Sequence, residues 1–410
     1  MARPSPRYIV AQMGARRGYA VPKILAQTGM LERFYTAVCG NQGWGRWLAL
    51  GARLPLLGPT FRKLANRKVP ETVLPFTTTF AAPNLRWHFH RLLHRNESAD
   101  AQFRTSITLR MELGEAACAN DQGDATHLFV MLTEFSPLMR EAKRRGVKVV
   151  SEIYILLSSV RIENEERAAF PDWEPIPMDV LKVMTEFGMD TLVPNSVDHF
   201  ICPSPAVAAD LVAQWGVRQE AVSIVPYGMN PAWLKLEPKT KHGRVLFVGS
   251  AILRKGIHYL GMAAEELQKR GRNYEFRIAG DVTDCVRSKS TCRHLHFLGR
   301  VPRDRIHEEF QKADVFTLPS LAEGSAEVTY EALAAGLPLV TTEAAGSVIR
   351  NGVEGRLIPE RDPVALADAI ESIIEDRALR DRMASAARLR AADYTWEKYG
   401  DRLISVLSAI

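Results

Sequence analysis

One segment near the end of the chain, residues 314–340, alternates strand and helix patterns in a way that few folds accommodate. Residues 314–320 (DVFTLPS) predict a buried strand, and the apolar residues further on predict a helix that ends at Gly336, which can adopt the left-handed conformation of a helix cap. A second strand pattern begins after Pro338. A helix that connects two strands indicates a parallel sheet, in which ligands bind at the carboxyl ends of the strands. The sequence therefore predicts an α/β fold with a ligand site in the loop that follows residue 320.

Two carboxylates lie in this predicted site. Glu323 is in the loop, and Glu331 lies eight residues later inside the predicted helix. The N–H groups of a helix N-terminus bind anions, and a carboxylate accepts hydrogen bonds from sugar hydroxyls. The pair therefore suits a phosphorylated sugar. Each residue taken singly also has a simpler explanation: the helix dipole favours an acid such as Glu331 in a first turn, and Glu323 is a solvated loop residue.

Further motifs occur in order around this pair. They are Val245–Gly249, Arg254–Gly256, and residues 276–281, 296–301 and 224–230. Together with the spacing of the two glutamates, they resemble the retaining glycosyltransferases of family 4, also described as glycosyl transferases group 1. The resemblance extends over roughly residues 224–340, whereas the first 220 residues match only loosely.

The resemblance implies the GT-B architecture, in which two Rossmann-like α/β domains face each other across a cleft. Residues 1–225 would form the acceptor-binding domain, and residues 226–393 would form the domain that binds a nucleotide-sugar donor. A closing helix within residues 394–410 would pack back on the first domain. A chain of 410 residues also exceeds what one hydrophobic core usually serves, which independently favours two domains.

The resemblance also implies roles for individual residues at the reacting centre. Lys255 would face the departing phosphate, with Arg254 as a second cation, and Glu323 would hold the donor sugar. Members of the family usually carry an arginine directly after the glycine that corresponds to Gly249, where this chain has Ser250. We therefore expect Arg254 or one of the N-terminal arginines to compensate.

The loop and helix that follow Glu323 would bind the rest of the donor. Glu331 would accept hydrogen bonds from the ribose hydroxyls, and the amides that follow the loop glycine would approach the diphosphate or the sugar. Relatives commonly carry glycine where this chain has Glu327, so we expect the loop to be tuned to a different sugar. The donor-binding residues predicted in this way are Glu331, Gly249, Ser250, Ser325, Ala326, Glu327 and Leu298.

The first half begins with a strand pattern at residues 8–13 and a glycine loop from Gly14 to Gly18. By residue pattern alone, this loop is either a tight turn or a backbone cradle for a phosphate, and the resemblance favours a loop that faces the cleft. A later strand ends at Glu152, where many relatives have a histidine that touches the donor sugar. Either Glu152 takes over that contact, or the alignment is shifted here.

These features predict a retaining glycosyltransferase that moves a sugar from a nucleotide sugar to a saccharide or lipid-linked acceptor, in cell-envelope or exopolysaccharide biosynthesis. In this family, retention is thought to proceed by attack on the face that the leaving group vacates. The leaving phosphate oxygen helps to deprotonate the acceptor, so no protein nucleophile is needed. The family requires no metal or other cofactor. Two alternatives stay open: a nucleotide-sugar epimerase of the same architecture, and a non-catalytic protein that binds nucleotide sugars.

Composition favours a cytoplasmic enzyme. Hydrophobic residues make up 46% and charged residues 24% of the chain, which is typical of globular proteins. No apolar run reaches the length of about 18 residues that a spanning helix needs, and the apolar run at the N-terminus is too short for a signal peptide. The five scattered cysteines are typical of reduced thiols.

Two groups of potential metal ligands occur in the sequence. His90 and His94 are one helical turn apart, with His88 nearby, but we expect no carboxylate to complete the set. Cys285 and Cys292 lack the spacing of a zinc site. The sequence therefore predicts no metal centre.

Positive charge gathers early in the chain, which has a net charge of +6. The segment from Gly43 to Lys68 mixes arginine and lysine with tryptophan and leucine, a composition that suits the surface of an anionic membrane. A buried helix with solvated cations explains the same pattern equally well. Nucleic acid is a weaker candidate partner, because no binding motif accompanies the charge. We therefore expect peripheral attachment to the inner face of a membrane.

Overall fold

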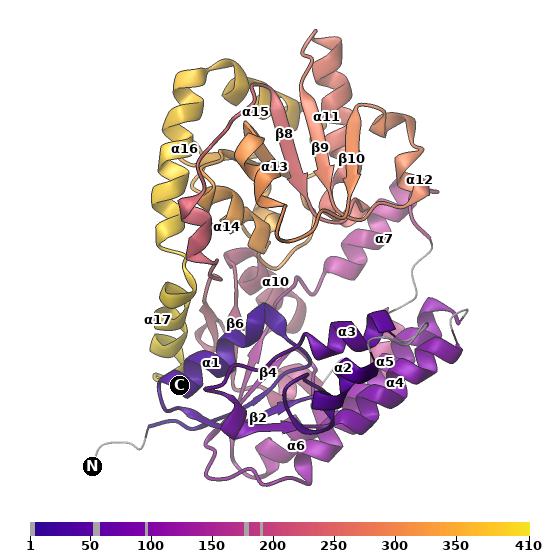
Figure 1. Ribbon diagram of the computed structural model, residues 1–410, viewed down its shortest axis with the longest axis vertical. Coiled ribbons are helices and arrows are strands. Elements are labelled where there is room, and N and C mark those ends of the chain that lie inside the picture. The colour runs from indigo at the N-terminus through magenta and orange to yellow at the C-terminus, as the bar shows by residue number, and fades with distance from the viewer. Residues whose placement is uncertain (1–4, 52–57, 95–96, 176–179, 189–191) are drawn as a thin grey trace.

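The computed structural model describes residues 5–51, 58–94, 97–175, 180–188 and 192–410, which form two α/β domains (Figure 1). The first sheet has the strand order β3-β2-β1-β4-β5-β6-β7, and the second has the order β10-β9-β8-β11-β12-β13. All strand pairs in both sheets are parallel. Each order reverses at the first strand of its sheet, which is the Rossmann arrangement and the place where such sheets bind ligands. The predicted fold class is confirmed.

The first domain contains the N-terminal sheet and the helices that cover it. Its strands are β1 (Tyr8–Ala11), β2 (Leu31–Thr36), β3 (Thr77–Thr79), β4 (His127–Met131), β5 (Lys148–Glu152), β6 (His199–Cys202) and β7 (Val222–Ile224). Its helices are α1 (Ala20–Gln27), α2 (Leu48–Gly51), α3 (Gly58–Ala65), α4 (Ala81–Leu93), α5 (Ala99–Cys118), α6 (Ser136–Arg144), α7 (Ser159–Ala169), α8 (Val180–Glu186), α9 (Leu192–Ser196) and α10 (Pro205–Trp215).

The second domain follows the same plan. Its strands are β8 (Arg244–Val248), β9 (Glu275–Ala279), β10 (Leu295–Gly299), β11 (Val315–Leu318), β12 (Leu339–Thr341) and β13 (Gly355–Leu357). Its helices are α11 (Ile257–Lys269), α12 (Asp284–Arg287), α13 (His307–Lys312), α14 (Glu327–Ala334), α15 (Pro363–Glu375) and α16 (Arg377–Ala392). The apolar run of β11 is fully buried because helices cover both faces of a parallel sheet.

The last helix, α17 (Trp396–Leu407), returns to the first domain and lies beside α1 (Figure 1). Leu403 and Leu407 are fully buried on its inner face. The hydroxyl of Tyr8 in β1 donates a hydrogen bond of 2.7 Å to the carbonyl of Leu407. The chain therefore passes between the domains a second time, and this crossing is anchored by apolar burial.

Replacement of Leu403 by alanine should lower the free energy of unfolding by about 2–5 kcal/mol, because it removes buried methyl groups and leaves a cavity. Ser405→Ala, an exposed change on the same helix, should stay within about 0.5 kcal/mol of wild type. Denaturant unfolding followed by circular dichroism measures both. Equal midpoints for the two variants would contradict the docking of α17.

Candidate active site

The predicted ligand loop lies at the carboxyl end of β11, next to the turn Leu253–Lys255 that precedes α11. Gly256 ends this turn with φ +71°, and a Cβ at this position would stand 2.0 Å from the carbonyl oxygen of Pro319. Only glycine permits so close an approach. As a result, the Lys255 ammonium lies 2.8 Å from a carboxylate oxygen of Glu323.

The same loop touches the first domain. A Cβ on Gly324 would stand 1.7 Å from the carbonyl oxygen of Tyr154, and the hydroxyl of Ser204 donates a hydrogen bond of 2.6 Å to the Gly324 carbonyl. Glu323 thus lies where the two domains meet.

A cavity of about 540 Å³ opens between the domains at this point. The second domain contributes Lys255, Glu323 and Glu331 to its lining, and the first domain contributes Arg16 and Arg17. The structure therefore brings the two predicted glutamates and the predicted lysine into one cavity, and it adds two arginines that face them from the other domain.

Arg17 is held by a buried group of residues from separate parts of the chain. It forms an ion pair with Glu152, and its guanidinium lies 3.9 Å from the centre of the Tyr227 ring. The Tyr227 hydroxyl donates a hydrogen bond of 2.8 Å to Glu152. Glu152 is fully buried beneath Arg17 and is not among the residues that line the cavity. Its carboxylate orients Arg17.

Arg16 is fixed in a similar way. It forms an ion pair of 2.9 Å with Glu134, and its guanidinium lies 4.1 Å from the centre of the Tyr154 ring. Sequence reasoning named the N-terminal arginines only as a group. The adjacent basic pair in the loop after the first strand was the signal that could have singled them out.

The remaining predicted residues are placed differently. Gly249 lines the cavity, whereas Ser250 lines a neighbouring cavity of about 390 Å³. Leu298, on β10, lines neither of these cavities. Gly14 and Gly18 have left-handed backbones, and Gly18 lines a separate groove between α1 and α17.

The predicted ligand amides are partly used within the protein. The amide of Ala326 donates to the carbonyl of Ala345, and the Ser325 side chain donates to the carbonyl of Gly346 at 2.7 Å. Both Ser325 and Ala326 still line the cavity. Helix α14, which begins at Glu327, has no side-chain cap at its N-terminus, so its first amides can serve a ligand.

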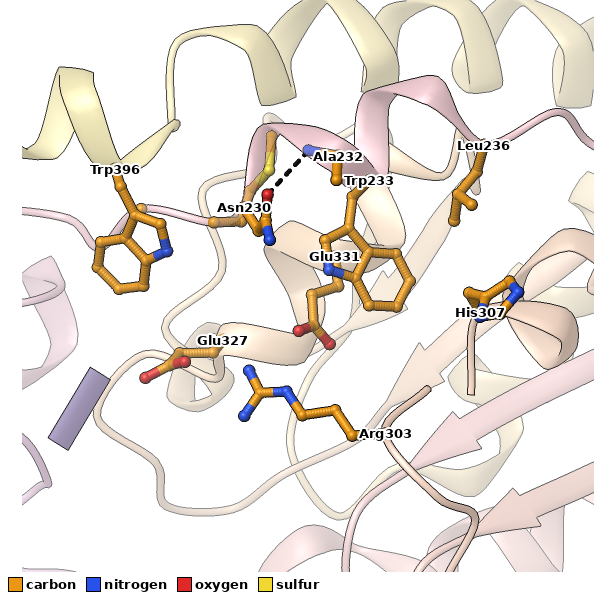
Figure 2. A pocket seen from close by; sticks show the side chains of 11 residues that line it. Asn230, Ala232, Trp233, Leu236, Arg303, His307, Glu327, Glu331 and Trp396 are labelled. Carbon is orange, nitrogen blue, oxygen red and sulfur yellow. Dashed lines mark hydrogen bonds between the residues drawn. The ribbon is translucent and has the colours of Figure 1, made fainter. Parts of the chain in front are cut away.

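Glu331 points toward Arg303 across a pocket of about 380 Å³ that adjoins the main cavity, and Glu327 lines the same pocket (Figure 2). Burial raises the pKa of Glu331 to about 7, opposed by Arg303 and reinforced by Glu327. Burial also raises the pKa of Glu327. Trp233 and Trp396 flank this pocket (Figure 2). The pocket is therefore lined by two carboxyl groups and by Arg303, a surface suited to hydroxyl groups rather than to a free anion.

Arg254 lies outside the lining of the cavities described so far. Its guanidinium forms an ion pair of 2.9 Å with Glu323 and another of 3.2 Å with Glu163 of the first domain. It also donates a hydrogen bond of 2.5 Å to the carbonyl of Ala322. The Arg254 guanidinium is therefore already engaged in contacts with other groups of the protein.

One expectation about metal ligands is wrong. A carboxylate does complete the histidine pair: a carboxylate oxygen of Glu97 lies 3.3 Å from Nδ1 of His94 and 3.7 Å from Nε2 of His90. The sequence could not show this contact, because Glu97 lies beyond the end of α4 and its distance from the two histidines depends on the folded chain. Among the residues described by the structure, no helix is both long and apolar enough to cross a membrane.

Comparison with known proteins identifies a matching family and relatives that cover part of the chain. Residues 234–390 match the family described as glycosyl transferases group 1. A glycogen synthase of Mycobacterium tuberculosis is 29% identical over 212 residues, covering 49% of this chain and 51% of that protein. A D-inositol 3-phosphate glycosyltransferase of Corynebacterium diphtheriae is 28% identical over 239 residues, covering 52% and 56%. The chain thus spans about half the length of these curated relatives.

Solved structures match both domains. A sucrose-phosphate synthase from Thermosynechococcus elongatus aligns with a TM-score of 0.65 at 17% identity, covering 98% of each chain. A protein from Anabaena, solved in complex with UDP and glucose, aligns with a TM-score of 0.61 at 15% identity, covering 99% of this chain and 100% of the other. At this identity the likeness shows the fold, which is GT-B.

The raised pKa of Glu331 makes stability depend on pH. The folded protein binds the proton more tightly than the unfolded chain, so this contribution is lost as pH rises from about 4.5 to about 7. Glutamine does not titrate, so the Glu331→Gln variant has no such pH-dependent contribution to lose. The free energy of unfolding of Glu331→Gln relative to wild type should therefore rise by about 1–3 kcal/mol between pH ~5 and pH ~8. Denaturant unfolding at both pH values measures it, and a difference independent of pH would refute the assignment.

Proposed function

We propose that this protein, whose residues 234–390 match the glycosyl transferases group 1 family and whose two domains form the GT-B fold, is a retaining glycosyltransferase that uses a nucleotide-sugar donor. The observation that carries the proposal is the cavity in which Lys255, Glu323 and Glu331 face Arg16 and Arg17 across the two domains. Cations on both walls, with carboxylates on one of them, suit a ligand with a charged diphosphate and neutral hydroxyl-bearing ends. The Anabaena protein of the same fold holds UDP and glucose, which supports a donor of this class.

The diphosphate charge would be met by protein cations. Lys255 approaches the cavity from the second domain, and Arg16 and Arg17 approach from the first. Preorganised cations in a site sheltered from water stabilise the negative charge that develops on a leaving phosphate. Arg17 is preorganised by its buried pair with Glu152 and its contact with Tyr227. No metal is invoked in this proposal.

The two glutamates would hold the neutral parts of the donor. Glu331 lies beside Arg303 and the indole of Trp233, where ribose hydroxyls would find a carboxyl group with a raised pKa. Glu323 would accept hydrogen bonds from the sugar while its charge is balanced by Lys255 and Arg254. A carboxylate bound to two cations is a poor nucleophile, which favours this holding role over covalent catalysis.

Transfer with retention would then need no protein nucleophile. The bond between the anomeric carbon and the phosphate oxygen breaks as the acceptor oxygen bonds to the same face of that carbon. The acceptor proton passes to the departing phosphate oxygen, which leaves as a nucleoside diphosphate. The cations described above stabilise that leaving group.

We further propose that the acceptor is a saccharide or a lipid-linked saccharide met at a membrane surface. The described part of the predicted membrane segment exposes Trp44, Trp47 and Leu50 by 78%, 64% and 72%. Arg62 and Lys63 on α3 are exposed as well. Exposed tryptophans beside cations are typical of proteins that bind the interface of anionic membranes. The stretch at 52–57, which includes Arg53 and several leucines, lies outside the described residues.

Lys255→Ala should lower the rate of sugar transfer by roughly 10²-fold, as expected when a group that stabilises the leaving charge is lost. The donor is first chosen by thermal shift with a panel of nucleoside diphosphates and their sugars, since a ligand that binds the folded protein raises its midpoint. Transfer or hydrolysis of that donor is then followed by release of nucleoside diphosphate.

Lys269→Ala is the matched control, because Lys269 is exposed at the far end of α11. It should retain the wild-type rate. Wild-type turnover by a folded Lys255→Ala protein would rule out the proposed role of Lys255. Conversion of the donor to an epimer without an acceptor would point to the rival epimerase activity.

Binding to anionic vesicles should be stronger than binding to neutral ones and should fall with added salt, because ions screen surface charges over about 8 Å at physiological ionic strength. Changing Arg62 and Lys63 to glutamine should weaken co-sedimentation further. Changing the exposed Lys269 and Lys398 to glutamine removes the same amount of charge but should leave co-sedimentation unchanged. Equal binding to both vesicle types at low salt would leave an acceptor in solution as the better proposal.

A further inference from the structure

Helix α7 belongs to the first domain by sequence but lies against the second domain (Figure 1). Glu163, Glu166, Arg167 and Phe170 follow the pattern i, i+3, i+4 and i+7, so they share one face along the helix and just beyond its end. Glu163, Glu166 and Phe170 contact the second domain directly, and Arg167 links carboxylates that do. This face therefore forms a contact between the domains near the start of α11.

Glu166 anchors the contact. It is 2% exposed, and its carboxylate accepts hydrogen bonds from Nε2 of His258 at 2.9 Å and from the Tyr259 hydroxyl at 3.1 Å. Arg361 adds an ion pair of 2.5 Å. The His258 ring is fully buried, and Phe170 packs against it with ring centres 4.5 Å apart. A buried carboxylate with this many partners fixes the position of α7 relative to α11.

Two further carboxylates reach the turn that carries Lys255. Glu174 accepts a hydrogen bond of 2.6 Å from the backbone amide of Leu253. Glu163 forms the 3.2 Å ion pair with Arg254. Arg167 lies 3.2 Å from Glu163 and 3.1 Å from Glu174, so it holds both acids in place. All three residues come from the first domain, whereas the turn belongs to the second.

The contacts continue from this turn to the cavity. Arg254 binds Glu323 at 2.9 Å, and the same Glu323 oxygen binds Lys255 at 2.8 Å. If Arg254 were drawn away, Glu323 would be left to Lys255 alone, and the charge that Lys255 presents to an anion would be neutralised more fully. The position of Arg254 therefore affects both charged groups at the centre of the cavity.

We propose that Glu163 and Glu174 are positioning residues through which the first domain sets the geometry of Lys255 and Glu323, and that Arg254 transmits this effect. The chemical consequence rests on the function proposed above, whereas the contact itself does not. The domains would then be coupled at the donor site by α7 as well as by the connecting segment and α17. Rotation of the first domain would move Glu163 and thereby change the geometry of Lys255 and Glu323 in the donor site.

The direction of the effect distinguishes positioning from simple charge. Glu163→Gln removes a negative charge from the neighbourhood of the diphosphate site. By long-range attraction alone this change should tighten binding of an anion and leave turnover equal or faster. Positioning predicts the opposite, a lower turnover number, because Arg254 and Glu323 lose their alignment.

The contact is tested first by hydrogen exchange and mass spectrometry of the full chain without ligand. Glu174→Ala and Glu163→Gln should each make the segment 250–257 exchange faster, by roughly tenfold for Glu174→Ala, which frees the Leu253 amide. Glu165→Ala and Glu165→Gln are the controls. Glu165 lies on the same helix but pairs with Arg161 and Arg361, away from this turn. Unchanged exchange in segment 250–257 of both test variants would overturn the proposal.

The chemical consequence is tested with the donor selected by thermal shift. Glu163→Gln should lower kcat by about tenfold with a smaller change in KM, and Glu165→Gln should change neither. Wild-type or faster turnover of Glu163→Gln would overturn the positioning role. If wild type neither binds nor turns over any nucleotide sugar, the proposed function fails instead, and the exchange experiment still decides whether α7 holds the turn.

Discussion

The carboxylate of Glu323, held between Lys255 and Arg254, is the interaction on which the candidate site depends. A half-buried carboxylate requires nearby cations, because desolvation of an unpaired charge is costly. Gly256 makes the arrangement possible by letting the turn of Lys255 pack against the end of β11. Lys255, which stabilises Glu323 in the free protein and lines the cavity, is therefore ready to meet an anionic ligand.

The two Rossmann-like sheets place this interaction at a boundary between domains. Each sheet exposes the carboxyl ends of its central strands to the other, which brings the loop after β1 opposite the loops after β8 and β11. The loop after β1 contributes arginines that are oriented by buried partners, as Arg17 is by Glu152. A site assembled in this way is complete only when the domains are correctly oriented. The contacts of α7 and α17 between the domains are thus relevant to function as well as to stability.

The elements of the second domain were the most predictable part of this protein. The strand that ends before Ser320, the helix that ends before Gly336 and the loop of Glu323 all lie where local patterns and glycine positions indicated. Lys255, Glu323 and Glu331 could be named because short motifs, in order along the chain, resemble those of a known family. The amide of Ala326 was assigned to a ligand although it bonds to the carbonyl of Ala345, a partner that no local pattern reveals.

The sequence by itself determined the alternation of strands and helices, and hence two parallel sheets with a site at their carboxyl ends, because these features depend on residue periodicity over short stretches. Only the tertiary structure determined which charged and polar residues contact each other. Arg17 pairs with Glu152 across 135 residues, and Glu166 binds His258 across 92 residues. Glu97 completes the pair of His90 and His94, although sequence spacing indicated no carboxylate there. Such contacts depend on how whole domains pack, and the spacing of residues along the chain carries no record of that packing.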